Sequence, residues 1–162
     1  MNQLALFAKH WTPGDVKTRL AADLAQALEI ADVASQGEAA QRAAEAVAAL
    51  HRTFLQTLLR RFNDAADERV LAFTPESARP AFAAELVSCS VDWVLQPQAS
   101  GDLGPRLAQH LSHAFAQGRR RVVLIGADCP HLPRVAIDQA LAALEREPVA
   151  IAAAEDGGYL LL

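Results

Sequence analysis

The chain has 162 residues, of which 52% are hydrophobic, and this length predicts a single folded domain over residues 1–162 with a buried core. A formal net charge of −4 argues against broad nucleic-acid binding, and no apolar run has the length of a membrane span or the pattern of a secretion signal. Only two cysteines occur, both in apolar surroundings, so we expect a reducing, cytoplasmic setting rather than a disulfide scaffold.

Strands and helices are predicted to alternate along the chain. A short apolar strand at 1–8 is followed by helices at about 15–30 and 38–62. Strands at 69–74 and 91–95 then precede a helix at 103–117, a strand at 121–125, a helix at 133–145 and a last strand at 149–152. The run at 121–125 is continuously apolar, as a parallel strand covered on both faces requires. This order predicts an α/β fold with a mainly parallel sheet.

The first twenty residues are typical of an anion site. A strand runs through a Pro-Gly turn into a helix start that carries Lys17 and Arg19, where free N–H groups and the positive helix end would face a phosphate. At the edge of a parallel sheet this usually means a nucleotide. Because the two cations lie two residues apart, Lys17 is the stronger candidate and Arg19 is free to pair with a carboxylate. We expect Asp15 to cap the helix.

Two acidic segments follow predicted strands. In Gly126-Ala-Asp-Cys-Pro130, Asp128 could hold Mg²⁺ or Mn²⁺ against phosphate oxygens or simply cap the turn, and the motif alone does not decide between these roles. In Glu155-Asp-Gly-Gly-Tyr159, Asp156 could be a second metal ligand or a base, although an ordinary Asp-Gly turn is the commoner explanation.

The remaining polar candidates are weaker. Gly101-Asp-Leu-Gly-Pro-Arg106 precedes a helix and could admit a base or ribose, with Arg106 on a phosphate, or could be a plain helix cap made by Asp102. His10 lies in the first loop and could touch a ligand. The histidines predicted on helices, His51, His110 and His113, are expected to be solvated.

In this order, the four motifs resemble the bacterial DUF2064 group of the nucleotide-diphospho-sugar transferase (GT-A) superfamily. The resemblance implies a Rossmann-like GT-A α/β/α sandwich, an NDP-sugar or NTP ligand, an unknown small-molecule acceptor and a divalent ion, Mg²⁺ or Mn²⁺. By position it implies catalytic roles for Lys17, Asp128 and Asp156, with the two aspartates also binding the metal. The implied nucleotide-binding residues are Ala8, Lys9, Pro13, Gly14, Lys17, Arg19, Gly101, Asp102, Leu103 and Arg106.

The chain also departs from that family pattern. Trp11 stands where members usually carry Pro, and Ala152 and Ala153 replace a Gly-Pro pair. Relatives continue past the Asp-Gly-Gly-Tyr motif, so we expect a C-terminally shortened fold in which a partner, such as a second copy, could supply the acceptor wall.

Three functions are compatible with these residues. The first is a metal-dependent glycosyltransferase that uses an NDP-sugar donor. The second is an NTP-dependent, guanylyltransferase-like nucleotidyltransferase, in which the same groups stabilise attack on an α-phosphate. The third is a non-catalytic nucleotide-binding module.

Overall fold

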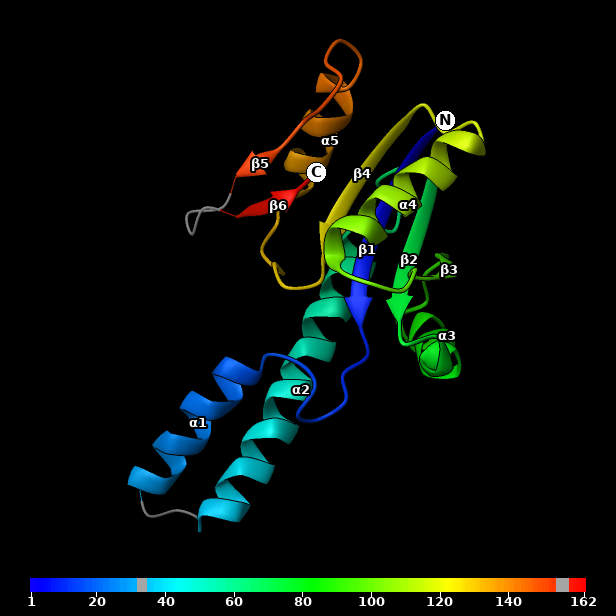
Figure 1. The fold of residues 1–162 in the computed structure, drawn as a ribbon. Helices are drawn as coiled ribbons and strands as arrows, with labels where there is room; N and C mark the ends of the chain where they lie inside the picture. The colour runs from blue at the N-terminus through cyan, green and yellow to red at the C-terminus, as the bar shows by residue number, and fades with distance from the viewer. Residues whose placement is uncertain (32–34, 154–157) are drawn as a thin grey trace.

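A computed structural model describes residues 1–31, 35–153 and 158–162, and its helices and strands alternate as expected (Figure 1). In chain order the elements are β1 (Asn2–Lys9), α1 (Thr18–Ile30), α2 (Gln36–Arg61), β2 (Glu68–Thr74), the 3₁₀ turn η1 (Glu76–Ala78), α3 (Arg79–Cys89), β3 (Val94–Pro97), α4 (Leu103–Ala116), β4 (Arg121–Gly126), α5 (Arg134–Ala143), β5 (Ala152–Ala153) and β6 (Tyr159–Leu161).

The strands form one sheet in the order β3-β2-β1-β4-β6-β5. The strands β1 to β4 run parallel, whereas β6 is antiparallel to β4 and pairs with β5 in the same antiparallel sense. After β1 the chain builds outward to β2 and β3, then returns to place β4 on the other side of β1. The order therefore reverses between β1 and β4, which is the point where open α/β sheets bind ligands. The predicted fold class is confirmed.

Side chains at alternate positions of the central strands point to opposite faces of the sheet and belong to two separate apolar clusters. Leu4, Leu6, Leu71 and Phe73 face a large core that also holds side chains of α2, α3 and α5. Among the described residues, the opposite face of the sheet packs mainly on α4. Ala5, Val70, Val122 and Leu124 of the strands form one cluster there with Leu107, Leu111 and Ala114 of that helix. The result is three layers, α/β/α, whose second helical layer is a single helix.

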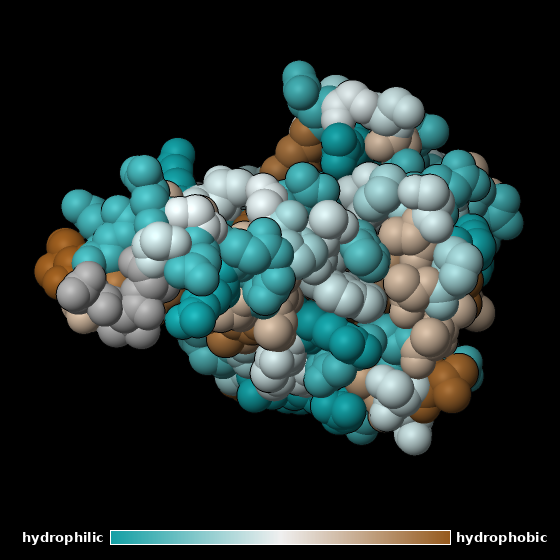
Figure 2. Space-filling view, turned by 90° about the horizontal axis from the view of Figure 1, so that it is seen from below, coloured by the Kyte–Doolittle hydropathy of each residue, from teal (hydrophilic) through white to brown (hydrophobic). Residues whose placement is uncertain are grey.

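The helices α1 and α2 form a hairpin that projects away from the sheet (Figure 1). No residue of α1 is fully buried, because the helix packs on α2 and not on the sheet. Seen from below, the projection carries mostly hydrophilic side chains, with apolar residues in small separate groups (Figure 2). A capping box formed by Ser35 and Glu38 starts α2.

Four elements differ from the sequence prediction: α3, β3, β5 and β6, the last of which follows the strand predicted to be the final one. The helix α3 was not expected, because Pro75 and Pro80 read as the end of a strand; Pro80 in fact lies in the first turn of α3, where a missing N–H costs nothing. The edge strand β3 starts at Val94 rather than at 91, and β5 starts at Ala152 rather than at 149. No helix in the described residues is long and apolar enough to cross a membrane.

Candidate functional site

A crevice of about 380 Å³ opens at the carboxyl ends of β1 and β4 and brings residues of the three later motifs together with Phe7, which lies near the end of β1. Its lining includes Phe7 from β1, Leu103 and Leu107 from α4, Gly126 at the end of β4 and Asp128 after it, and Gly158 and Tyr159 at the start of β6. The motifs therefore meet at the strand-order reversal that the sheet topology creates.

An ion pair joins two of the predicted catalytic residues, Lys17 and Asp128, the second of which lines this crevice. The Lys17 ammonium lies 2.7 Å from Oδ1 of Asp128 and 5.0 Å from the centre of the Phe54 ring. Lys17 is the residue just before α1 and adopts a left-handed conformation, with φ 47° and ψ 44°. The helix start thus lies at the site, as the phosphate-loop prediction requires.

The loop before α1 is built differently from the prediction in one respect. Asp15 does not cap α1, because Lys17 occupies the N-cap position. The Asp15 carbonyl instead accepts a hydrogen bond of 2.9 Å from the Lys9 ammonium. Gly14 makes the turn at φ 85°, where a side chain would be strained, and Pro13 is exposed. Arg19 is exposed on the first turn of α1.

Buried His51 lies beneath the ion pair, and the expectation that it is solvated is wrong. The residue is 4% exposed, and its Nε2–H donates a 3.1 Å hydrogen bond to the carbonyl of Lys9. Its Nδ1 lies 3.7 Å from Oδ1 of Asp128 and has no hydrogen-bond partner among the described residues. The spacing Val47, His51, Leu55 places it on the buried face of α2, and this periodicity was the available signal.

These neighbours keep Asp128 ionised. His51, and after it Lys17, hold the pKa of the Asp128 carboxyl well below its usual range, against the opposing effect of burial. Three quarters of the Asp128 side-chain surface is nevertheless exposed, so the carboxylate remains open to a ligand from the crevice.

The residues present fit a divalent cation. The Asp128 carboxylate at a strand end offers an oxygen ligand, and the buried Nδ1 of His51 beside it has no hydrogen-bond partner among the residues described. No cluster of three or more acidic, His or Cys side chains able to hold a metal occurs in the part of the chain described. Such an ion would complete its shell with water or substrate oxygens. Asp156 lies outside the described residues.

The loop that carries Asp128 is held from α2. The guanidinium of Arg61 donates hydrogen bonds of 2.5 Å and 3.0 Å to the carbonyls of Pro130 and Leu132. The amide of Ala127 donates to the carbonyl of Phe7, which ties the same loop to the end of β1. One helix therefore supplies His51, Phe54 and Arg61 to the site.

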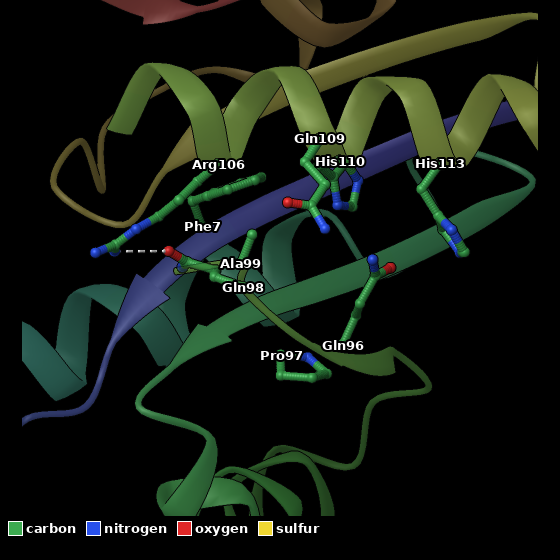
Figure 3. A pocket seen from close by; sticks show the side chains of 9 residues that line it. All are labelled: Phe7, Gln96, Pro97, Gln98, Ala99, Arg106, Gln109, His110 and His113. Carbon is green, nitrogen blue, oxygen red and sulfur yellow. Dashed lines mark hydrogen bonds between the residues drawn. The ribbon is translucent and has the colours of Figure 1, made fainter. Parts of the chain in front are cut away.

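A second, polar hollow of about 90 Å³ lies on the α4 side of β1 to β3 and shares Phe7 with the crevice (Figure 3). The Gln98 amide donates to the carbonyls of Ala8 and Ala72 and so fixes the ends of β1 and β2. Arg106, expected on a phosphate, donates instead to the Gly101 carbonyl at 2.6 Å and to Oε1 of Gln98 at 3.3 Å. Sequence reasoning missed Gln98.

The start of α4 borders both cavities. Asp102 stands at the N-cap position of α4 without a side-chain hydrogen bond to the helix, so this carboxylate is not the cap that the sequence allowed. Leu103 is exposed and lines the crevice, so the Gly101–Arg106 segment borders it.

Trp11 turns toward the protein rather than into the crevice. It stacks on His10 at 4.6 Å, meets Phe82 edge-on at 5.2 Å and carries the Arg52 guanidinium over its ring. The aromatic contacts anchor the first loop to α3, so Trp11 stiffens this loop.

Comparison with known proteins gives the family. The family model described as "Uncharacterized protein conserved in bacteria (DUF2064)" matches residues 57–162, more than half of the chain. The chain belongs to the DUF2064 family. No curated protein matches this DUF2064 chain.

Solved structures extend the similarity to the N-terminal motif, which lies before the residues that the family model matches. Eight chains match, among them the "putative nucleotide-diphospho-sugar transferase" from Desulfovibrio desulfuricans G20, with 29% identity and a TM-score of 0.76. The alignment covers 99% of the DUF2064 chain and 61% of that protein, so the chain spans about three fifths of its neighbour's length. The nucleotide-diphospho-sugar transferase-like fold is therefore shown for residues on both sides of the crevice.

Proposed function

We propose that the protein is a metal-dependent glycosyltransferase that takes a nucleotide-diphospho-sugar as donor. The observation that carries this proposal is the Lys17–Asp128 pair at the strand-order reversal, where Asp128 lines a crevice together with residues of the two other later motifs. The name of the D. desulfuricans neighbour supports the donor class.

Transfer from such a donor breaks the bond between the anomeric carbon and the diphosphate and forms a new bond from that carbon to the oxygen of an acceptor hydroxyl, whose proton passes to the departing diphosphate or to water. Negative charge collects on the departing diphosphate, so a fixed cation accelerates the step. Lys17 would release Asp128 and place its ammonium on those oxygens, next to the N–H groups that begin α1. Mg²⁺ or Mn²⁺ held by Asp128, and by Asp156 if it reaches the site, would neutralise further charge.

The remaining residues divide between the two cavities. Lys9 and Gly14 would shape the loop around the phosphates, and the apolar side chains of Phe7 and Leu107 would keep water from the reacting carbon. The polar hollow beside Gln98, which Arg106 helps to hold open, would take the base or the sugar.

Titration calorimetry with NDP-sugars and NTPs, with and without Mn²⁺, tests the proposal. We expect metal-dependent binding of an NDP-sugar, followed by slow release of free sugar in the absence of an acceptor. Tight NTP binding with pyrophosphate release would instead make the protein a nucleotidyltransferase. Binding of either nucleotide without turnover in the presence of a panel of acceptors would indicate a non-catalytic module.

A further inference from the structure

The ring nitrogen Nδ1 of His51 lies beside the carboxylate that would hold the metal ion. We propose that Nδ1 of His51 is a protein ligand of the divalent ion at Asp128, which makes the site a mixed nitrogen–oxygen site matched to Mn²⁺ rather than Mg²⁺. The inference rests on the proposed function for its setting, but its test uses the metal alone.

The hydrogen bond on the far side of the ring is the first argument. Because Nε2–H of His51 donates to the Lys9 carbonyl, Nδ1 is the ring nitrogen directed at Asp128. It holds a proton toward the carboxylate when the ring is charged and offers a lone pair to a metal ion when that proton is lost. Metal-binding histidines almost always donate their other N–H to a backbone carbonyl or a carboxylate, which fixes the ring in this way.

Burial and distance are the second argument. A nitrogen this deeply buried, with no hydrogen-bond partner in the part of the chain that the structure describes, loses the hydrogen bonds it would make in water, so an occupant is expected there. Two ligands of one ion, each at about 2.1 Å, lie roughly 3.0–3.5 Å apart at octahedral or tetrahedral angles. The 3.7 Å between Nδ1 and Oδ1 of Asp128 needs only a small closure to reach that range.

The third argument is that the Lys17 ammonium already places a positive charge against the Asp128 carboxylate. It binds the same Oδ1 that faces His51, so a metal ion would displace it. The displaced ammonium would then be free for a phosphate, which couples metal binding to diphosphate binding. A nitrogen ligand is poorly suited to Mg²⁺, which prefers oxygen, whereas Mn²⁺ accepts carboxylate and imidazole together.

Mn²⁺ binding to tag-free protein, followed by electron paramagnetic resonance with and without UDP or GDP, tests the inference. We expect Mn²⁺ to bind more tightly than Mg²⁺ and its pulsed spectrum to show a directly bound imidazole ¹⁴N, replaced by ¹⁵N lines after ¹⁵N-histidine labelling. His51→Gln keeps an amide N–H for the Lys9 carbonyl, and should weaken Mn²⁺ binding about tenfold or more and abolish the nitrogen coupling.

Two variants keep the test decisive if His51→Gln fails to fold. His131→Gln, at an exposed histidine three residues from Asp128, should leave the coupling unchanged, and Asp128→Asn, at an exposed side chain, should lose Mn²⁺ binding. Bound Mn²⁺ without nitrogen coupling, coupling lost in His131→Gln, or no Mn²⁺ binding under any condition would overturn the inference. Donor binding and turnover are measured separately, so a failed glycosyltransferase assay with intact coupling would reject only the proposed function.

Discussion

Acid should destabilise the protein through His110, a histidine buried in the α4 layer. The side chain is 5% exposed, and its Nε2–H donates a 3.0 Å hydrogen bond to Oε1 of Gln3. Burial, helped by the nearby His113, lowers the pKa of His110 from 6.5 to about 4. A lowered folded-state pKa means that the unfolded chain takes up the proton first, so stability is complete above pH 6.5 and is lost as the pH falls toward 4.

The size of this loss follows from the two pKa values. Linkage gives a loss of about 2 kcal/mol by pH 5 and about 3 kcal/mol by pH 4, relative to neutral pH. Near pH 5 most unfolded-state carboxylates are still ionised, so the histidine contribution stands apart from theirs.

Urea unfolding of the wild type and His110→Gln at pH 7.5 and pH 5 measures the effect. Glutamine keeps a donor for Gln3 but cannot titrate, so the variant should lose about 2 kcal/mol less than the wild type between the two pH values. His113→Gln, at an exposed position of the same helix, is the matched control and should follow the wild type closely. Equal losses in the wild type and His110→Gln would refute the reasoning.

Three further substitutions test the site. Lys17→Met should weaken NDP binding in calorimetry by about tenfold to a hundredfold, because a charged hydrogen bond to phosphate is lost. Arg19→Met should change NDP binding by less than about threefold. Equal effects of the two variants would contradict the assignment of Lys17 as the phosphate-binding cation. Gln98→Leu should lower the free energy of urea unfolding by about 1–3 kcal/mol, since two strand-end carbonyls lose their donor, and unchanged stability would count against this role. Arg61→Met should speed amide hydrogen exchange across residues 127–133 by freeing two loop carbonyls, and unaltered protection there would be the contrary result.

Local sequence pattern was enough to predict the central elements. The continuous apolar run predicts β4, and the Pro-Gly turn predicts where β1 ends. The spacing of apolar residues predicts α4. The four motifs were predicted to follow strands, and parallel strands bring their carboxyl ends to one sheet edge. The crevice at Asp128 was therefore expected before the fold was known.

The errors concern residues whose environment comes from distant parts of the chain. Buried His51 donates a hydrogen bond to the carbonyl of Lys9, 42 residues away, and buried His110 donates one to Gln3, 107 residues away. A polar residue on a helix is expected in solvent unless such a partner is known. The helix α3 was missed for a local reason, since its early proline resembles a strand terminator.

The central claim is that one crevice holds both the diphosphate and its metal. A crystal structure with Mn²⁺ and a nucleoside diphosphate, with Mn²⁺ located by anomalous scattering, tests this most directly. We predict an Mn²⁺ peak about 2.1 Å from a carboxylate oxygen of Asp128, with the Lys17 ammonium moved onto a phosphate oxygen. A nucleotide bound elsewhere, or a Lys17–Asp128 pair left intact beside a bound diphosphate, would contradict the account.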